Sequence, residues 1–513
     1  MGIGIRGVHR IKATGRRILR RPVAQQFTPA VVQKEILSGI TVALALIPES
    51  LAFAAIAKVN PMVALYTSFC MAIVIAIAGG RPAMISAATG SMALLMTSLV
   101  ANHGVEYLFA ATVLTGVLQF SIGLFKLEKV FSFIPQSVIA GFVNGLGILI
   151  FVAQIQQFAG EPWQMPVMVA VTLAIVYIFP RITKAVPAPL VAIIAMTIVA
   201  IGLKLPIRRV GDIGEITRNL PSLHFPNVPF TLETFGIILP YAVTLAIVGL
   251  LESLLTAALL DDLTDTSSSR NQETKGQGIA NIVTGFLGGM AGCGMVGQSI
   301  INVRSGGSRR LSTGVAGAFL LFSIFALRDW VQQIPMAALV GVMIMVAFET
   351  FDWRSLTTWR KTPMPELIVM PLTVGITLLT HDLAKGVVVG VLVSLLIFGW
   401  QAANVRVTAS LGQGDTKVYA LSGQLFFGST SQLIEQFTYR DDPPQIILDL
   451  HHAHLWDFAA ASSLAKIISK YHQFHKQVRL VGLTPEGAAA LRRAGLPPEQ
   501  MILRTDRLHS QVA

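Results

Sequence analysis

Two acidic residues lie inside long apolar stretches of the sequence, and the two stretches resemble each other. Glu49 and Glu252 each begin the pattern Glu-Ser-Leu-x-x-Ala-Ala, 203 residues apart. A carboxylate at bilayer depth costs about 2.5–3.5 kcal/mol on insertion scales, so a membrane protein that keeps two is expected to use them. The pattern predicts an internal repeat with one ionisable group in each half.

Two Gly-rich stretches, at 86–91 and 292–299, interrupt apolar sequence, and each is followed by a short helical pattern. Such interruptions predict discontinuous helices whose N-termini point inward, where free N–H groups and the helix dipole favour an anion. The alternative is close packing of helices through small residues. Because the two stretches occupy matched positions, we favour an anion site.

The elements that position these residues are membrane-spanning helices. Hydrophobic residues make up 53% of the 513-residue sequence and charged residues 13%, against roughly 25% charged in soluble domains. This composition predicts a polytopic membrane protein. Fourteen segments are apolar enough to span or enter the bilayer: 34–59, 62–79, 83–101, 107–125, 135–158, 165–180, 187–203, 231–260, 276–291, 294–303, 311–327, 335–350, 366–381 and 384–402.

Internal repeats divide these segments into two halves. An Ile-Pro pair followed by Gly at 134–141 recurs at 334–341, and a Gly-Gly pair followed by Gly at 79–90 recurs at 288–297. The matches lie seven segments apart. Since seven is odd, the second half must enter the membrane from the opposite side. An inverted repeat of this kind places the substrate site of secondary transporters near the membrane midplane.

The net charge of +12 is explained by membrane topology rather than by nucleic acid binding. Residues 1–34 carry eight Lys and Arg residues and no Asp or Glu, which predicts a cytoplasmic tail, 1–33, that faces anionic lipid. The tail lacks the features of a cleaved secretory signal. Basic residues gather in alternate loops, so both the N-terminus and the C-terminus are expected in the cytoplasm of a multi-pass cell (inner) membrane protein.

After about residue 404 the chain changes character. Strands near 418–421, 446–450 and 478–483 alternate with helices near 429–439, 457–474 and 485–494, which predicts a small α/β domain. His451, His452 and His454 are expected in a loop after a strand, without further ligands for a metal. We interpret Cys70 and Cys293 as small apolar filler, with no disulfide or zinc site.

Several motifs resemble signatures of the sulfate-permease (SulP) family of anion transporters. The C-terminal domain is similar to the STAS domain that this family carries. The motifs cover nearly the whole membrane region: 38–44 with Ile47-Pro48, Pro61 with 65–68, 249–256, Asn271-Gln272-Glu273 with 276–281, and Gly306-Gly307.

The resemblance implies a seven-plus-seven inverted repeat with core and gate subdomains, an elevator-like movement of the core and a homodimer. The transport domain would cover 34–402, with repeats at 34–203 and 231–402, and the cytoplasmic STAS domain would cover 412–513. The anion would lie between the N-termini of the third and tenth helices. The residues there are Ala88, Thr89, Gly90, Gly294, Met295, Val296, Gly297 and Gln298.

The resemblance also assigns ion coupling to Glu252 and Thr256, whereas the coupling role of Glu49 is predicted from the repeat and from its place beside Pro48. Animal relatives place a basic residue at the position of Gln298, so this chain would rely on helix dipoles and amides. Val296 replaces a Thr of the sodium-coupled relatives, so the resemblance does not extend to a complete sodium site.

The STAS domain departs from its signalling relatives at one position. Asp457 is followed by Phe458 and Ala459 rather than by a phosphorylatable Ser. We therefore expect this domain to dimerise or to dock a cytoplasmic protein.

Electrostatics favours proton–anion symport, since a bound anion repels an ionised carboxylate and so favours proton uptake. We expect Pro48 to break the helix of Glu49, which makes Glu49 the preferred proton carrier and Glu252 a coupling or structural partner. Sulfate, bicarbonate and small dicarboxylates all suit such a site. The alternatives are a sodium-coupled bicarbonate transporter, a nucleobase-type permease of the same plan, and an anion channel or sensor that signals through the STAS domain. The sequence has no catalytic, nucleotide-binding or metal motif, so neither an enzyme nor a cofactor is expected.

Overall fold

A computed structural model describes residues 28–129, 134–183, 187–214, 220–357, 364–380, 383–412 and 415–503. The tail before residue 28, predicted to face lipid, lies outside this range. The chain forms two compact units. One consists of Met1–Glu128 with Ala153–Met345, and the other of Lys129–Val152 with Val346–Ala513.

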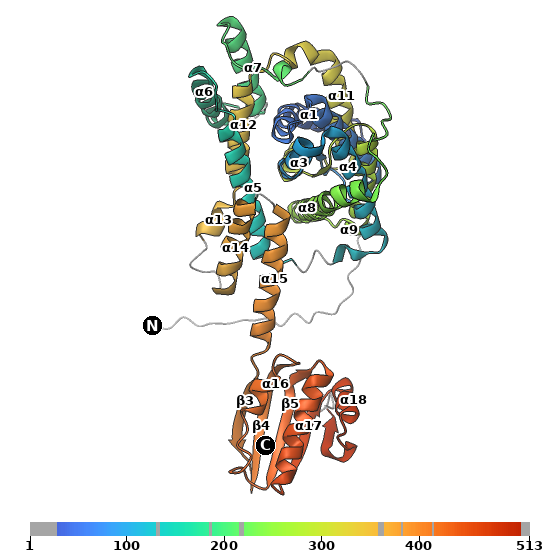
Figure 1. The fold of residues 1–513 in the computed structure, drawn as a ribbon, viewed down its shortest axis with the longest axis vertical. Coiled ribbons are helices and arrows are strands. Elements are labelled where there is room, and N and C mark those ends of the chain that lie inside the picture. The colour runs from blue at the N-terminus through green and yellow to red at the C-terminus, as the bar shows by residue number, and fades with distance from the viewer. Residues whose placement is uncertain are drawn as a thin grey trace, which may run out of the picture. The chain divides into compact units, whose positions relative to one another are not determined.

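Two halves of the membrane region repeat one order of elements (Figure 1). The first half contains α1 (Pro29–Ala57), α2 (Pro61–Ala78), β1 (Ser86–Ala88), α3 (Gly90–His103), α4 (Val105–Leu124), α5 (Gln136–Gln156), α6 (Gln164–Ile178) and α7 (Ala188–Gly202). The second half contains α8 (Leu232–Thr264), α9 (Arg270–Phe286), β2 (Gly292–Gly294), α10 (Val296–Arg304), α11 (Arg310–Val331), α12 (Met336–Thr350), α14 (Met364–Thr380) and α15 (Leu383–Ala402). A short helix, α13 (Trp353–Thr357), follows α12. In each half the third position is a three-residue strand followed by a helix. The Gly-rich stretches predict the interruption and the helix after it, but not the strand.

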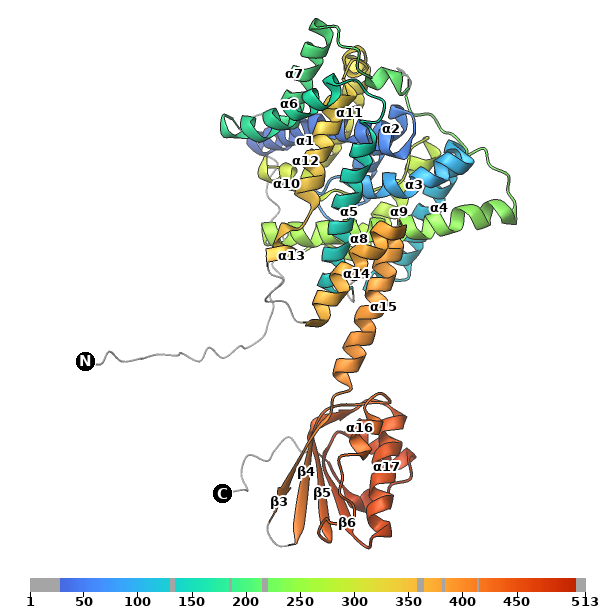
Figure 2. The ribbon, with the colours of Figure 1, turned by 60° about the vertical axis from the view of Figure 1, so that its left-hand side comes forward.

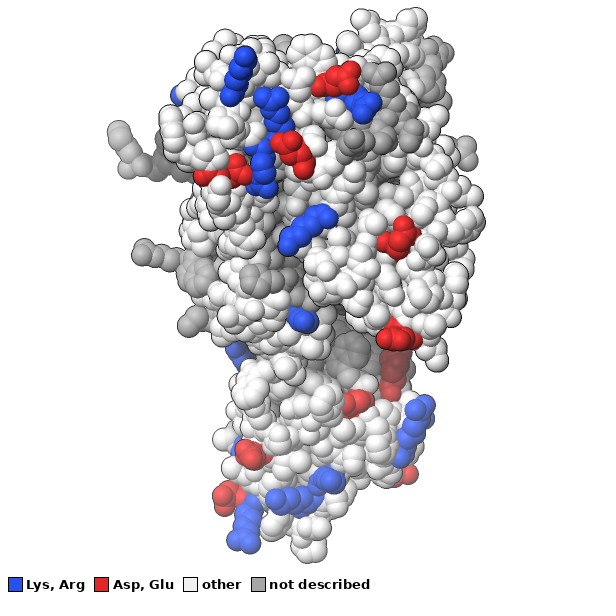
Figure 3. Space-filling view, turned by 45° about the horizontal axis from the view of Figure 1, so that its top comes forward, with Lys and Arg blue, Asp and Glu red and all other residues white. Residues whose placement is uncertain are grey.

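The described helices have the character of membrane spans. Eight of them are long and apolar enough to cross a bilayer. Figure 3 shows broad areas of one face without charged side chains, as expected of a surface that faces lipid. The chain is therefore a multi-pass membrane protein.

Two expectations about the helices are wrong in detail. Pro48 does not break its helix, because α1 runs without interruption from Pro29 to Ala57. Membrane helices tolerate an internal proline when neighbouring groups satisfy the freed carbonyl, and α8 likewise contains Pro240. The ninth segment begins at Arg270 rather than at 276 and ends at Phe286, just before Gly288 with φ +72°.

Glycines allow the helices of the first unit to approach closely. A Cβ atom added at Gly116 of α4 would lie 2.5 Å from the backbone nitrogen of Ile282 in α9. A Cβ added at Gly341 of α12 would lie 2.7 Å from the Thr172 Cβ of α6. Small residues at such crossings are typical of membrane interfaces, where lipid supplies no hydrophobic driving force between helices.

The second unit uses the same device at the position that the repeat predicts. Gly141 of α5, the counterpart of Gly341, faces Thr373 of α14, and an added Cβ would lie 2.6 Å from the Thr373 Cβ. Both repeat-matched glycines therefore pack against a threonine of a neighbouring helix. The Gly of the repeated Ile-Pro and Gly pattern therefore marks a close contact between helices in both halves.

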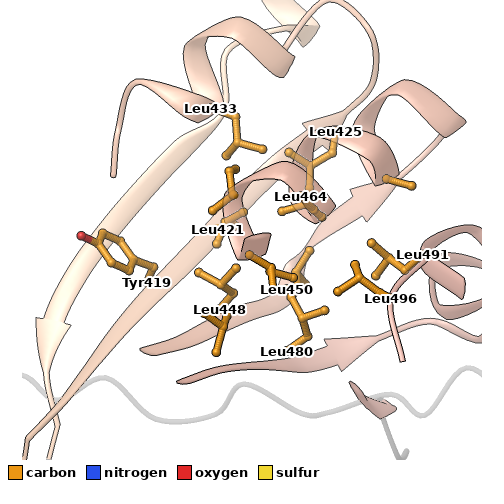
Figure 4. Close-up of a cluster of buried hydrophobic side chains, with 14 of the residues drawn as sticks. Tyr419, Leu421, Leu425, Leu433, Leu448, Leu450, Leu464, Leu480, Leu491 and Leu496 are labelled. Atoms are coloured by element: carbon orange, nitrogen blue, oxygen red, sulfur yellow. The ribbon is translucent and has the colours of Figure 1, made fainter. Parts of the chain in front are cut away.

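The C-terminal domain is a five-stranded sheet with helices (Figure 2). The strands are β3 (Arg406–Leu411), β4 (Thr416–Leu425), β5 (Gln445–Leu455), β6 (Gln477–Leu483) and β7 (Met501–Leu503), in that spatial order. The first pair is antiparallel and the other pairs are parallel. The helices are α16 (Thr430–Ile434), α17 (Phe458–Gln473) and α18 (Pro485–Arg493). Leucines of β4, β5 and β6 meet Leu464 of α17 in the core (Figure 4).

Three details of this domain differ from the sequence-based expectations. The sheet begins at Arg406, before the expected boundary at 412, because β3 pairs with β4. The helix expected at 429–439 is shorter in the structure, where α16 covers Thr430–Ile434. The three histidines lie on β5 rather than in a loop, since β4 pairs with it as far as Leu455 and matches Ser422 to His452. The part of the chain that the structure describes contains no group of three or more His, Cys, Asp or Glu residues that could hold a metal ion.

Candidate anion-binding site

Two helices begin inside the first unit, at the positions that the sequence predicts. Helix α3 starts at Gly90 after the N-cap Thr89, and α10 starts at Val296 after the N-cap Met295. Neither of these two N-cap side chains accepts a hydrogen bond from a backbone N–H group of its helix. The first N–H groups of both helices are therefore left to other acceptors, and they carry the positive end of the helix dipole.

The strands before these helices bring the N-termini together. β1 and β2 pair antiparallel, with Ser86 opposite Gly294 and Ala88 opposite Gly292. Because each strand leads into its helix, α3 and α10 leave the pair in opposite directions. Their N-termini consequently face a shared central zone, which is the geometry expected of an anion site made by two half-helices.

Buried side chains satisfy the remaining polar groups of the two strands and their flanks. Such partners are needed because irregular backbone at membrane depth has no water to bond with. Asn281 of α9 bonds both the N–H and the carbonyl of Gly292, at 2.9 and 3.1 Å. Four hydroxyls accept the backbone N–H groups of other residues: Ser253 from Gly294, Ser68 from Ala88, Ser299 from Ile85 and Thr67 from Met290.

Glu252 lies between the two discontinuous segments. Its Oε2 atom accepts hydrogen bonds from the Ser91 hydroxyl and the Cys293 thiol, both at 2.7 Å. Ser91 is the second residue of α3, and Cys293 is the middle residue of β2. The Thr89 hydroxyl is 3.2 Å from the Cys293 sulfur. The carboxylate of α8 is thus held at the start of α3 by two neutral donors.

Glu49 of α1 makes the matching contact with the second discontinuous helix, α10. The Gln298 side chain, in the first turn of α10, donates a hydrogen bond from Nε2 to Glu49 Oε1. Gln298 is buried and Glu49 is partly accessible. Each repeat-related glutamate therefore contacts the discontinuous helix of the other repeat.

Thr256, the third predicted coupling residue, lies one turn after Glu252 in α8. Its hydroxyl donates to the Glu252 carbonyl at 2.8 Å and lies 3.4 Å from the Gly294 carbonyl. Oxygen atoms of Glu252, Thr256 and Gly294 are ligands of the kind that a hard cation takes. Val296 supplies no side-chain oxygen, and its side chain is 42% exposed.

The eight predicted anion-site residues are together in space but differ in accessibility. Ala88, Thr89 and Met295 are buried in the strand pair and caps. In contrast, a Cβ added at Gly297 would meet nothing within 4 Å. The first turn of α10 is therefore the part of the predicted site with free space beside its backbone.

Two residues of the site were missed or misread in the sequence. Cys293 is not apolar filler, because its thiol donates to Glu252. Ser91 lies in the Gly-rich stretch 86–91 but is not among the predicted site residues, although its hydroxyl donates to Glu252. The available signal was its position two residues after the cap Thr89, where a helix N-terminus points at its ligand.

Comparison with known proteins shows which family has this architecture. The family model described as the sulfate permease family matches residues 32–170 and 161–373, and the STAS domain model matches 409–510. A protein of Bacillus subtilis described as the putative sulfate transporter YbaR is 52% identical over 90% of this chain and 97% of its own length. The bicarbonate transporter BicA of Picosynechococcus is 26% identical over 92% of this chain and 93% of its own.

Solved structures share the fold of this chain. The transmembrane domain of a cyanobacterial BicA matches with a TM-score of 0.62 and 29% identity, over 71% of this chain and 97% of that domain. The murine Slc26a9 anion transporter, in its inward-facing state, matches with a TM-score of 0.82 over 94% of this chain and 92% of its own, at 16% identity. The chain therefore belongs to the sulfate permease family, a family of membrane anion transporters rather than enzymes, and carries a C-terminal STAS domain.

Proposed function

We propose that the chain is a secondary active transporter that moves a small anion, such as sulfate or bicarbonate, together with protons. The observation that carries the proposal is that Glu49 and Glu252 each contact the discontinuous helix of the other repeat. The anion site and the two ionisable groups are thus one unit. The printed names of the relatives, which include sulfate and bicarbonate transporters, support the choice of anions.

Proton coupling follows from the arrangement of charges. The positive ends of α3 and α10 attract an anion, whereas an ionised carboxylate beside them repels it. Protonation of Glu49 or Glu252 removes this repulsion, so binding of the anion and of the proton favour each other. We take Glu49 as the proton carrier because Ser91 and Cys293 hold the carboxylate of Glu252. Both glutamates are partly accessible, so accessibility does not distinguish them.

Sodium is the competing coupling ion. Glu252, Thr256 and the Gly294 carbonyl offer oxygen atoms, and the Thr256 hydroxyl keeps its lone pairs for a cation because it donates its proton to the helix backbone. Val296 contributes a hydrocarbon side chain where a further ligand would be needed. This ligand set supports protons over sodium.

The wider transport cycle is proposed from the family resemblance. A core that contains α1 to α4 and α8 to α11, which pack on one another, would carry the anion across the membrane in an elevator-like movement against the remaining helices. The protein would work as a homodimer in the cell (inner) membrane, with both termini in the cytoplasm. The STAS domain would support dimerisation or dock a cytoplasmic protein.

Counterflow in proteoliposomes tests the function and identifies the anion. Vesicles with the purified chain are loaded with sulfate, bicarbonate or a dicarboxylate, and uptake of the same labelled anion is followed under an imposed pH or sodium gradient at clamped membrane potential. Acceleration by an inward proton gradient alone supports the proposal. Acceleration by sodium alone identifies a sodium-coupled transporter. Uptake without saturation or counterflow identifies a channel.

A further inference from the structure

The helices that form the anion site carry no basic side chain near it. Among the residues that the structure describes in α1, α3, α8 and α10, the Lys and Arg residues are Lys34 and Arg304. Arg304 is the last residue of α10, eight residues after Val296, or about 12 Å along the helix axis. Lys34 precedes Glu49 by fifteen residues, which is about 22 Å.

Charged groups on the neighbouring elements also lie near helix ends. Arg81 bonds the Leu260 carbonyl and pairs with Asp261, both near the end of α8. The titratable group that faces Glu252 directly is the Cys293 thiol. The other charged groups of the helices packed around the site lie in the first or last two turns: Glu35, His103, Glu106, Glu233, Asp262, Arg270, Glu273, Lys275, Arg310, Arg328 and Asp329. The remaining titratable groups of these helices are neutral in their usual form: Tyr66, Cys70, Tyr107 and Tyr241.

The positive charge that the site offers is therefore small and of known origin. Each helix N-terminus is equivalent to roughly half an elementary charge, so α3 and α10 together supply about one. One positive charge balances one negative charge on an anion. It leaves a second negative charge facing Glu49 and Glu252.

We propose that the site selects singly charged anions, and that a doubly charged anion binds only when both Glu49 and Glu252 carry protons. This inference rests on the proposed function and specifies its substrate class. Protons on the two carboxyl groups are the adjustable positive charge of the site. A singly charged anion requires at most one of the two carboxyl groups to be neutral. A dianion requires both to be neutral.

Gln298 is the residue that decides this charge selectivity. Its amide donates to Glu49 in the first turn of α10, where a cationic side chain would lie beside the anion. Because Gln298 is neutral, it leaves the second charge of a dianion without a partner. Arginine at this position would add that partner and could pair with Glu49 or the anion.

Perchlorate and sulfate provide a test that separates charge from shape, because both are tetrahedral oxyanions and they differ by one charge. Binding to the purified full chain is measured by calorimetric titration across pH. We expect the wild-type protein to bind perchlorate more tightly at about pH 8, and the affinity for sulfate to rise about twice as steeply as that for perchlorate when the pH falls.

Two variants complete the test. Gln298→Arg should raise the affinity for sulfate relative to perchlorate by about tenfold at high pH, whereas Gln298→Met, which is uncharged and similar in length, should not. Gly297→Asp should abolish the binding of both anions, which locates the binding at this site.

Outcomes that contradict the inference differ from those that contradict the function. Equal pH dependence for the two anions, or an unchanged preference in Gln298→Arg, would overturn the charge assignment and leave anion transport intact. No binding of either anion would likewise overturn the inference, and binding that resists Gly297→Asp would overturn the proposed site. The function itself would be overturned only if no anion shows counterflow.

Discussion

The side-chain amide of Gln298, in the first turn of α10, donates a hydrogen bond to the carboxylate of Glu49 in α1. The opposite half contains the matching contact, in which Ser91 of α3 donates to Glu252 of α8 at 2.7 Å. The serines after the two glutamates are linked instead to the strand of their own half. Ser253 accepts the Gly294 N–H directly, and Ser50 lies 2.6 Å from Ser68, which accepts the Ala88 N–H. Each Glu-Ser pair therefore joins a long helix to the discontinuous segments at the site.

Replacing Glu49 with Gln tests the proton carrier. The amide oxygen can still accept from Gln298, but the side chain can no longer release a proton. We expect pH-gradient-driven uptake to be lost while anion binding is kept. Initial uptake rates with and without a pH gradient, together with binding titrations, measure the two effects. An unchanged response to the gradient would remove Glu49 from the coupling mechanism.

Replacing Gly297 with Asp tests the anion position. An added side chain meets open space there, so the variant should fold. Its carboxylate would lie at the N-terminus of α10, where it competes with the anion for the dipole and the N–H groups. We expect transport of every anion to be blocked. Gly297→Asn is the matched neutral control, and equal activity of the two variants would place the anion elsewhere.

Removing the donors to Glu252 tests how its charge is held. Ser91→Ala and Cys293→Ala each remove one hydrogen bond to Oε2, and losing a donor to a buried group costs about 1–3 kcal/mol. We expect the double variant to shift the pH profile of transport, because the ionised form of Glu252 loses both partners. The single variant Cys293→Ser keeps a donor to Glu252, so its pH profile of transport should match that of the wild-type protein. A profile that does not move in the double variant would make these contacts merely structural.

Two truncations test the boundary between the domains. Deleting residues 412–513 leaves β3 without β4, its partner in the sheet, and an unpaired strand edge promotes aggregation. Deleting residues 405–513 removes the whole sheet. We expect the longer deletion to give a monodisperse membrane domain that binds anions, and the shorter deletion to aggregate, as size-exclusion chromatography in detergent would report. If both behave alike, β3 does not define the start of the STAS domain.

The buried Asp442 of the STAS domain predicts sensitivity to acid. Its carboxylate accepts four side-chain hydrogen bonds, from Lys417, Tyr419, Thr438 and Tyr471. Burial alone would raise the pKa of Asp442, but these hydrogen bonds hold the pKa below its ordinary value. Because the native pKa is lower than that of the unfolded chain, the ionised group stabilises the domain above about pH 4. This stabilisation is lost as the pH falls through the native pKa.

Hydrogen exchange of the full chain measures this effect. Asp442→Asn should lower the local unfolding free energy of β4 and α17 by about 1–3 kcal/mol at neutral pH, and it should remove most of the acid dependence. Asp441→Asn, at the exposed neighbouring residue, is the control and should change neither. Equal protection in the Asp442 variant would show that the network does not stabilise the domain.

The sequence by itself determined the elements and the candidate residues. Apolar length identified the spans, because a helix must satisfy its backbone within the bilayer. The paired glutamates and Gly-rich stretches predicted the candidate site, because carboxylates and breaks at membrane depth are costly unless they are used. The helix starts at Gly90 and Val296 followed from the same local signals.

Tertiary structure alone decided which groups meet. The contact of Ser91 with Glu252 joins residues 161 apart in sequence, and that of Gln298 with Glu49 joins residues 249 apart, so no local pattern specifies either. The role of Cys293 depended on the pairing of β1 with β2, which turns its thiol toward Glu252. The continuity of α1 through Pro48 and the place of His452 on β5 were likewise set by neighbouring elements. Packing partners overrule local propensity when they satisfy the backbone that the local sequence leaves open.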